Sequence, residues 1–250
     1  MPEGPSRVIL REETEAFVGR KILRVSGNSK QDIARLDQQN VLALRSWGKH
    51  FLIECAHFSV RIHFLLFGSY RINEDEPNAV PRLCLEFSNG QRLNFYACSV
   101  RFIERPLDDV YDWTAHAMNP LWDAAQARRK RRAVPGMLAA DALLDQALFA
   151  GVGNIIKNEV LHRIRVHPES TVGALPARKL GERVPQARDY SFDFHHWKKA
   201  FVLKKHYQVH TKTNCPRDGA PLQYRRHVGK AGRGAFFCEV CQRLYRAEDA

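Results

Sequence analysis

The stretch LLDQALFAGVGNIIKNE, residues 143–159, places a glycine-rich turn between two apolar segments. The leucines before the turn have helical spacing, and the apolar residues after it continue with the same period. Gly151 and Gly153 can adopt positive φ angles and let backbone amides approach a neighbour closely. The stretch therefore predicts two helices, over about 136–149 and 154–163, that are joined by this turn.

This turn has two possible interpretations. Asn154 is a natural N-cap residue, and free amides at a helix N-terminus attract phosphate. Lys157 would add a positive charge one turn into the second helix. The turn is either a phosphate-binding site or an ordinary connection between two helices that needs glycine only for its backbone.

Toward the N-terminus the apolar period changes. Residues 5–18 predict a helix that Gly19 ends. Between about 21 and 105 the period is closer to two, and residues 46–50 and 88–91 stand as hairpin loops between strand-like runs. The second loop contains an Asn-Gly pair, the strongest short hairpin signal. We therefore expect a mostly antiparallel β domain, a sandwich or a barrel, with a helix in front.

The chain of 250 residues carries 39 Lys and Arg against 27 Asp and Glu, a formal net charge of +12. This excess indicates a polyanionic partner, with nucleic acid first, although a basic surface kept for solubility is the alternative. The 44% of hydrophobic residues exclude a fully disordered chain, and neither a membrane-spanning run nor a signal peptide is recognisable. We expect a soluble cytoplasmic protein without a membrane partner.

Five consecutive basic residues, 128–132, stand just before Pro135-Gly136. They are compatible with a solvated linker and with a strap that faces phosphates. Of the six cysteines, Cys215, Cys238 and Cys241 lie near the C-terminal end, and the last two have the C-x2-C spacing of a metal site.

Three blocks of this sequence resemble the formamidopyrimidine-DNA glycosylase/endonuclease VIII family. The run Gly151–Glu159 is similar to its helix–two-turn–helix motif, and the start Met1–Pro5 is similar to that of endonuclease VIII enzymes. The third block is a cysteine finger with Arg233 five residues before Cys238. The first block and Lys205-His206-Tyr207 also resemble the third vertebrate Nei-like branch, and we expect a bacterial member of the family.

The resemblance implies an α+β multidomain fold and a monomer that acts on damaged DNA, single- or double-stranded, held in a cleft between two halves. The expected order is an N-terminal catalytic β-sandwich domain with a leading helix (1–115), a basic interdomain linker (116–135), a helical DNA-binding domain with the helix–two-turn–helix motif (136–210) and a zinc-finger-type β-hairpin (211–246).

Removal of the initiator methionine would expose Pro2 as a secondary amine. An α-amino group titrates at about 8 against about 10.4 for lysine, so a useful fraction is unprotonated at neutral pH. By the resemblance, Pro2 forms a Schiff base with the sugar and starts β- and δ-elimination, and Glu3 is the general acid and base. In an arbitrary protein the same two residues would be a chain start without chemistry.

Three further residues are assigned by the resemblance alone. Lys49, in a predicted hairpin loop, matches the lysine that contacts phosphate and assists proton transfer during elimination. Arg233 matches the finger arginine that grips phosphates around the lesion and supports the second elimination. Glu159 matches an acidic residue that supports the active site structurally.

An enzyme that acts on a base takes it out of the duplex, and apolar side chains fill the vacated space. Leu65, Leu66 and Phe67 match the void-filling loop of the family, and His63 would contact a phosphate. The wholly apolar run could instead be a buried strand. Ser6 stands where relatives often have glutamate, which argues against purines of the 8-oxoguanine type.

The resemblance also implies one structural Zn²⁺ that positions Arg233, because metal binding supplies folding energy to short modules. The upstream motif is Cys215-Pro216-Arg217-Asp218, where most relatives have a second C-x2-C. The fourth ligand beside the three cysteines is Asp218, through a carboxylate oxygen, or His210 or His227. A further alternative is that no stable zinc is held.

The sequence thus predicts a bifunctional DNA glycosylase/AP lyase of base excision repair. By resemblance to endonuclease VIII, its substrates would be oxidised pyrimidines and hydantoins, and the second resemblance suggests single-stranded, bubble or crosslinked DNA. The alternative is a non-catalytic DNA-binding module on the same scaffold, which would bind DNA without covalent chemistry.

Overall fold

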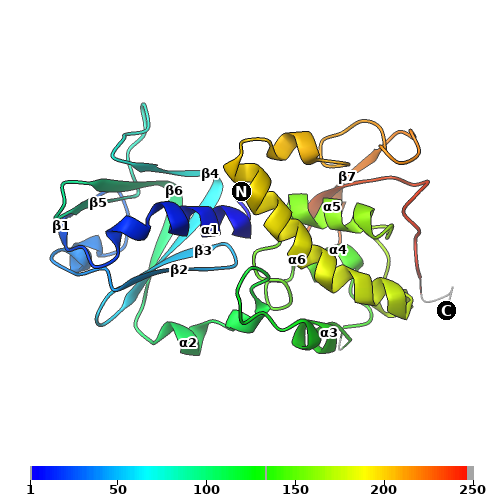
Figure 1. Cartoon of the computed structure of the whole chain (residues 1–250), viewed down its shortest axis with the longest axis horizontal. Coiled ribbons are helices and arrows are strands. Elements are labelled where there is room, and N and C mark those ends of the chain that lie inside the picture. The colour runs from blue at the N-terminus through cyan, green and yellow to red at the C-terminus, as the bar shows by residue number, and fades with distance from the viewer. Residues whose placement is uncertain (1, 133, 247–250) are drawn as a thin grey trace. The chain divides into compact units, whose positions relative to one another are not determined.

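The computed structural model describes residues 2–132 and 134–246. The chain divides into two units, Met1–Asp112 and Trp113–Ala250 (Figure 1). Each unit has its own apolar core.

The first unit is a helix followed by an antiparallel sheet. Its elements are α1 (Gly4–Glu13), η1 (Glu15–Phe17), β1 (Ile22–Ser26), η2 (Ile33–Leu36), β2 (Ala43–Trp47), β3 (His50–Glu54), β4 (Ser59–Ile72), β5 (Leu83–Phe87), β6 (Arg92–Ile103) and α2 (Leu107–Val110).

The strands form one six-stranded sheet in the order β1-β5-β6-β4-β3-β2. Every neighbouring pair is antiparallel, and α1 packs against β2 and β3. Both predicted hairpins are confirmed, since β2 and β3 are joined through Gly48 and Lys49, and β5 and β6 through the Asn-Gly turn. The predicted first helix ends at Glu13, where Thr14 leaves the helical conformation at φ −102° and ψ 5°, and η1 follows.

The second unit is helical and ends in a two-stranded hairpin. Its elements are η3 (Trp113–Ala115), α3 (Ala124–Arg132), α4 (Ala139–Leu144), α5 (Asn154–Arg163), η4 (Val172–Ala174), α6 (Ala177–Lys199), η5 (Leu203–His206), β7 (Gln223–Val228) and β8 (Arg233–Phe237).

Part of the stretch predicted as a basic linker is a helix. The Asp123 carboxylate accepts hydrogen bonds from the amides of Ala125 and Gln126 at 2.7 and 2.9 Å and so caps α3. Ala127 of α3 is buried, and α3 packs against α6. The basic run 128–132 therefore belongs to an ordered element of the second unit.

The helix predicted over 136–149 is shorter than expected. In the structure this helix is α4, which ends at Leu144 because Asp145 leaves the helical conformation at ψ 114°. The Asp145 carbonyl then accepts the amides of Leu148 and Phe149 at 3.1 and 2.8 Å, which turns the chain toward α5. The second predicted helix is confirmed as α5 with the expected bounds.

The core of the second unit joins the helices and the hairpin. Val160 of α5, Tyr190 of α6 and Phe237 of β8 are completely buried in one cluster. The hairpin predicted as a separate finger is therefore packed onto the helical core. None of the helices within the described residues combines the length and the apolar character needed to cross a membrane.

Candidate functional site

The N-terminal residues lead directly into α1. Glu3 has an extended backbone, with φ −91° and ψ 175°, and its carbonyl accepts the Ser6 amide at 3.0 Å. Pro5 stands in the first turn, where the amide it lacks is not needed. Glu3 is only 3% exposed, and Pro2 is half-buried. The predicted amine and the predicted acid are thus held next to each other at the start of a helix.

One helical turn after Glu3, Arg7 places a positive charge inside the first unit. It is 2% exposed, and its guanidinium lies 4.0 Å from the centroid of the Phe64 ring. Burial lowers the pKa of Arg7 to about 10, which leaves it charged at neutral pH. Because Phe64 immediately precedes the predicted wedge, this cation–π contact ties α1 to the strand that carries the wedge.

The turn between β2 and β3 presents Lys49 beside two imidazoles. His50 pairs with His63 of β4, and the ring centroids are 5.2 Å apart. The Tyr111 hydroxyl lies 3.2 Å from Nδ1 of His50. Burial, followed by the charges of Arg61, His63 and Lys49, lowers the pKa of His50 to about 3.

His63 has a similar electrostatic environment. Burial, and then the charges of Arg61, Lys49 and Arg7, lower the pKa of His63, against a backbone hydrogen bond with Lys49 that raises it. Both imidazoles are therefore neutral at pH 7. A contact of His63 with a phosphate would be a hydrogen bond rather than an ion pair.

The predicted wedge residues leave the sheet in the middle of β4. Leu65, Leu66 and Phe67 are 50%, 60% and 85% exposed. The alternative interpretation of this run as a buried strand is therefore wrong. Three adjacent apolar side chains in solvent are costly for an isolated domain and are typical of an interaction surface.

A bulge in β4 explains this exposure. The pairing of β4 with β6 shifts its register between Phe64 and Ser69. A Cβ atom on Gly68 would lie 2.7 Å from both the Ala97 carbonyl oxygen and the Phe64 Cβ, so only glycine fits there. Ala97, on the partner strand, has a positive φ of 42°. Both strands thus depart from regular geometry at the point where the wedge emerges.

The turn between α4 and α5 is closed by a side chain that the sequence did not single out. Gln146 Oε1 accepts the Gly151 amide at 3.0 Å. Its Nε2 donates to the carbonyls of Leu144 and Val152 at 2.7 and 3.1 Å. Gly151 has a φ of 104°, which is the positive value that the sequence predicted for this turn.

The roles predicted for Asn154 and Lys157 require correction. Gly153, rather than Asn154, is the N-cap of α5, and Asn154 Oδ1 is buried without a hydrogen-bond partner among the described residues. Lys157 is 0% exposed, and its ammonium group donates to the Gly234 carbonyl at 2.8 Å. Because α5 is enclosed on all sides, Lys157 connects α5 to β8 and offers no surface charge to a phosphate.

Glu159, also completely buried, fixes the segment that precedes the finger. Its carboxylate accepts the backbone amides of Gln208, Val209 and His210 at 2.9, 3.1 and 2.8 Å. Burial raises the pKa of Glu159, and these three amides oppose that rise. The geometry is that of a structural support.

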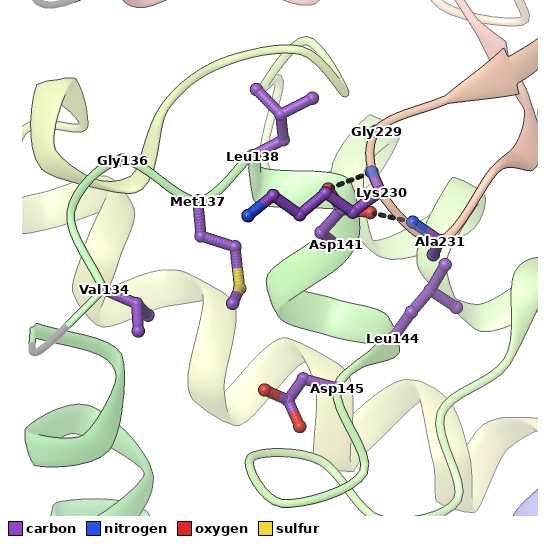
Figure 2. A pocket seen from close by; sticks show the side chains of 10 residues that line it. All are labelled: Val134, Gly136, Met137, Leu138, Asp141, Leu144, Asp145, Gly229, Lys230 and Ala231. Carbon is purple, nitrogen blue, oxygen red and sulfur yellow. Dashed lines mark hydrogen bonds between the residues drawn. The ribbon is translucent and has the colours of Figure 1, made fainter.

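Arg233 is exposed and begins β8 directly after the turn of the hairpin. Asp141 of α4 holds this turn, because its carboxylate accepts the amides of Lys230 and Ala231 at 2.9 and 3.0 Å (Figure 2). Gly229 has a φ of 65°, and a Cβ atom there would come within 2.2 Å of the Asp141 carboxylate. The backbone that carries Arg233 is thus anchored to the helical core.

The same contact borders a pocket of about 710 Å³. Figure 2 shows Asp141 and the hairpin turn on one side of it and Met137 on the other. The pocket is lined by Val134, Gly136, Met137, Leu138, Asp141, Leu144, Asp145, Gly229, Lys230 and Ala231.

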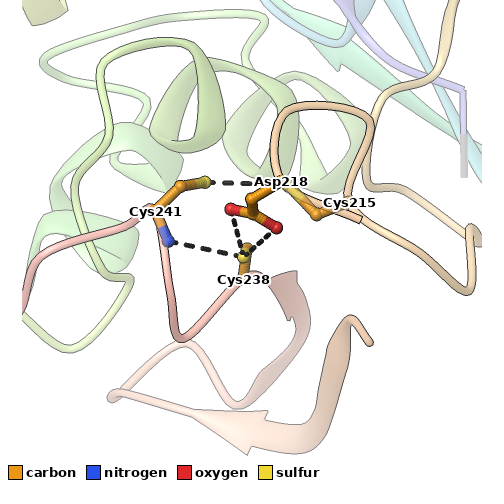
Figure 3. Close-up of side chains that lie close together, drawn as sticks. All are labelled: Cys215, Asp218, Cys238 and Cys241. Carbon is orange, nitrogen blue, oxygen red and sulfur yellow. Dashed lines mark hydrogen bonds between the residues drawn. The ribbon is translucent and has the colours of Figure 1, made fainter. Parts of the chain in front are cut away.

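The metal-ligand prediction rests on four residues that the fold brings together. One ligand atom from each of Cys215, Asp218, Cys238 and Cys241 lies within 4.8 Å of the other three (Figure 3). The Sγ atoms of Cys215 and Cys241 are 3.7 Å apart, and the Asp218 oxygens lie 3.5 and 3.3 Å from Cys238 Sγ. Tetrahedral bonds of about 2.3 Å to sulfur and about 2.0 Å to oxygen give edges of about 3.5–3.8 Å, so this set fits zinc.

The other fourth ligands that the sequence left open lie elsewhere. His210 Nδ1 is 3.0 Å from the side-chain nitrogen of Asn158, and His227 Nδ1 is 3.2 Å from the Gly232 carbonyl. Neither imidazole belongs to the cluster. The Ala220 amide, which bonds the Asp218 carboxylate, lowers the pKa of Asp218 and keeps it ionised as a ligand must be.

Two residues beside the cluster were missed in the sequence. Arg217 donates from Nη1 to Cys241 Sγ at 3.0 Å, and His162 Nε2 lies 3.5 Å from Cys215 Sγ. Arg217 stands inside the Cys215–Asp218 motif, so its position gave a signal. His162 is 53 residues from its sulfur partner and only folding brings the two together.

Comparisons with known proteins follow the same division of the chain. Residues 1–99 match the formamidopyrimidine-DNA glycosylase N-terminal domain, and residues 116–187 match the formamidopyrimidine-DNA glycosylase H2TH domain. The formamidopyrimidine-DNA glycosylase of Gluconobacter oxydans is 29% identical over 97% of this chain and all of its own length. Endonuclease 8-like 3 of Xenopus laevis is 28% identical over 89% of this chain, which spans 38% of that relative.

Solved structures share the fold. A viral DNA glycosylase superposes with a TM-score of 0.85 at 18% identity and covers 96% of this chain and 100% of its own. The Lactococcus lactis formamidopyrimidine-DNA glycosylase, bound to DNA that contains an abasic site, has a TM-score of 0.84 at 23% identity, with 96% and 99% covered. With the two domain matches in the expected order and this fold, the chain belongs to the formamidopyrimidine-DNA glycosylase/endonuclease VIII family.

Proposed function

We propose that this protein is a base-excision-repair DNA glycosylase that also cleaves the strand at the abasic site it creates. The observation that carries the proposal is the pair of Pro2 and buried Glu3 at the start of α1, inside the region that matches the family's N-terminal domain. The DNA glycosylases among the relatives and the DNA-bound structural neighbour support it.

The proposed reaction begins once the initiator methionine is removed. The Pro2 nitrogen attacks C1′ of the damaged nucleotide, the glycosidic C–N bond breaks, and the base leaves with a proton supplied by Glu3. The nitrogen loses its own proton and shares its electron pair with C1′, while the C1′–O4′ bond breaks and O4′ takes up a proton. The product is the iminium of the ring-opened sugar. The iminium acidifies the C2′ proton, and loss of that proton expels the 3′ phosphate in β-elimination.

The other residues act on DNA in this proposal. Lys49 contacts phosphate and assists proton transfer, and Arg233 grips phosphates and supports elimination of the 5′ phosphate. Leu65, Leu66 and Phe67, which stand exposed on the β4 bulge, fill the space of the extruded nucleotide. Oxidised pyrimidines and hydantoins are the proposed bases.

Zinc is the metal that we propose for the cluster of Cys215, Asp218, Cys238 and Cys241. A bound ion would supply folding energy to the loops around it. Phe237, next to Cys238, is buried in the helical core, so these loops and the hairpin that presents Arg233 share one support.

Borohydride trapping on DNA with an abasic site tests the chemistry. Borohydride reduces an iminium to a stable amine, so the wild-type protein is expected to form a covalent adduct whose mass lacks Met1. Pro2→Gly is expected to lose most of the adduct. Glu3→Gln is expected to keep trapping at a preformed abasic site and to lose base excision, because only the excision step needs the acid.

Glu74→Gln, which changes an exposed carboxylate far along the sequence, is the matched control and should behave as wild type. DNA binding without any adduct, by protein whose N-terminus is confirmed as Pro2, would instead favour the non-catalytic module.

A further inference from the structure

The end of α6 displays an aromatic side chain in solvent. Phe201 is 96% exposed, and its backbone has a positive φ of 59°. This left-handed conformation favours glycine, and a bulky residue there is strained. Phe201 therefore combines two unfavourable features, apolar exposure and backbone strain.

The hydrogen bonds at the end of α6 explain why the left-handed conformation falls on Phe201. The Phe201 amide donates to the Lys198 carbonyl at 3.1 Å, and the Val202 amide donates to the Trp197 carbonyl at 2.9 Å. These are the two bonds of a Schellman ending, in which the left-handed position is usually glycine. Phenylalanine at this position gives up helix-ending stability and points outward.

The segments on either side of Phe201 are held by contacts within the second unit. His206 stacks on Trp197 with ring centroids 4.1 Å apart and an interplanar angle of 1°. Arg163 of α5 lies 6.0 Å from the Trp197 centroid, and the Lys205 amide donates to the Val202 carbonyl at 2.9 Å. Phe201 is thus carried by an ordered turn, which reduces the entropy lost when a ligand covers its ring.

Basic residues flank Phe201 along the chain. Four lysines at positions 198, 199, 204 and 205 are exposed, and residues 194–217 contain no aspartate or glutamate. An apolar partner helix would have to cover these charged lysines, which is unfavourable. A polyanion with flat apolar faces matches both the lysine charges and the Phe201 ring. We name Phe201 with these four lysines the α6-end surface.

We propose that the α6-end surface binds an unpaired base of single-stranded DNA, which stacks on Phe201 while the lysines contact the adjoining phosphates. Base pairs inside a duplex have their faces covered by their neighbours, so the ring selects DNA with a free base. This inference depends on the proposed function in one respect, since it takes DNA to be the polyanion that binds.

Fluorescence anisotropy with a labelled oligothymidine and with a duplex of equal length tests the surface. Phe201→Gly is expected to weaken oligothymidine binding by about 5- to 150-fold, the range for one stacked base, and to change duplex binding less than twofold. The same variant is expected to raise Tm, because glycine relieves the positive φ. A side chain that served folding alone would lower Tm.

Phe201→Trp should retain the affinity, and Phe201→Ala should lose it without the gain in Tm. Leu121→Ala removes another exposed apolar side chain, 66% exposed, and is expected to leave both affinities unchanged. Folded Phe201→Gly and Phe201→Ala proteins that bind oligothymidine like wild type would overturn the proposal, and the surface would then be left to a protein partner.

Borohydride trapping on an abasic duplex separates this result from the proposed function. Phe201→Gly is expected to trap as wild type does. If the wild-type protein forms no adduct, the proposed chemistry is refuted. If Phe201→Gly nevertheless weakens oligothymidine binding, the proposal for the α6-end surface still holds.

Discussion

At the scale of residues, burial decides which charged side chains are accessible to a ligand and which support the fold. Lys49 and Lys157 both follow glycine-containing turns in the sequence, and both match the requirements of a phosphate contact. Lys49 stands in a hairpin turn, whereas Lys157 lies inside α5 at 0% exposure. The same residue type therefore has different surroundings, because one segment is a turn and the other a buried helix.

His50 makes stability depend on pH. Its folded pKa of about 3 lies below the ordinary value of 6.5, so the folded state favours the neutral imidazole. This contribution is present above pH 6.5 and is lost as the pH falls toward 3, because the unfolded chain then binds the proton first. Between pH 6.5 and 5 the loss is about 1–2 kcal/mol for one such group.

Urea unfolding at pH 7.5, 6.5 and 5.0 measures this dependence. His50→Gln is expected to lose less stability than wild type across the same interval. An equal pH slope in both proteins would contradict the assignment to His50.

Gly68 permits the β4 bulge that exposes the wedge. In Gly68→Ala the new Cβ meets the Ala97 carbonyl at 2.7 Å, so we expect a loss of about 1–3 kcal/mol and weaker binding to duplex with an abasic site. Gly181→Ala is the control, since a Cβ atom meets nothing within 4 Å there and α6 should gain up to about 1 kcal/mol. Chemical denaturation and anisotropy measure the two effects, and a stable Gly68→Ala protein would be inconsistent with the packing.

At the scale of elements, α5 organises the second unit through polar contacts made from its buried faces. Lys157 reaches the Gly234 carbonyl of β8, Glu159 reaches the backbone of residues 208–210, and His162 reaches the sulfur of Cys215. One helix thus positions the hairpin that carries Arg233, the segment after the α6-end surface and the cluster of Cys215, Asp218, Cys238 and Cys241. In this chain the helix–two-turn–helix motif holds the hairpin and the loops around the cluster to the helical core.

Asp141 is expected to position Arg233 without touching DNA. Asp141→Ala removes the acceptor of two backbone amides, which should cost about 1–3 kcal/mol and loosen the hairpin turn. Hydrogen exchange at Lys230 and Ala231 should accelerate, and strand cleavage should fall more than oligonucleotide binding. Asp189→Ala, on the exposed side of α6, is the control; unchanged exchange in Asp141→Ala would contradict the anchor.

The metal cluster is expected to hold zinc and to stabilise the finger. Asp218→Ala should lower zinc content and affinity by removing one of four ligands, and Asp218→Cys should restore both, because a fourth thiolate completes the site. Elemental analysis and competition with a chromophoric chelator measure this. Stoichiometric zinc in Asp218→Ala would show that Asp218 is not a ligand.

At the scale of the whole molecule, the net charge of +12 predicts a salt-dependent affinity for DNA. Each phosphate that a basic residue neutralises releases counterions, so the binding constant falls as salt rises. Raising salt from 50 to 200 mM should weaken duplex binding by at least about tenfold, the value for only two phosphate contacts. Anisotropy across this range measures the slope, and a flat response would exclude a phosphate-binding surface.

The local sequence pattern was sufficient to predict those structural features that depend on residues close together in the chain. The two hairpins of the first unit, the bounds of α5 and the positive φ of Gly151 all follow from residues within one or two turns. The spacing of the cysteines likewise indicated a metal site. The premature end of α4 and the shift of the N-cap from Asn154 to Gly153 were not predicted, because tertiary context overrides local helix propensity at such positions.

What the sequence by itself determined is chemical identity: the imino acid at position 2 beside a carboxylate, the charge excess, the set of thiols and the family. Tertiary structure alone decided which side chains reach solvent and which meet each other across long separations. It buried Lys157, exposed Phe67 on a bulge, and brought Asp141 to the turn before Arg233. The reason is physical, since burial and long-range hydrogen bonds depend on how whole elements pack, and no local stretch contains that information.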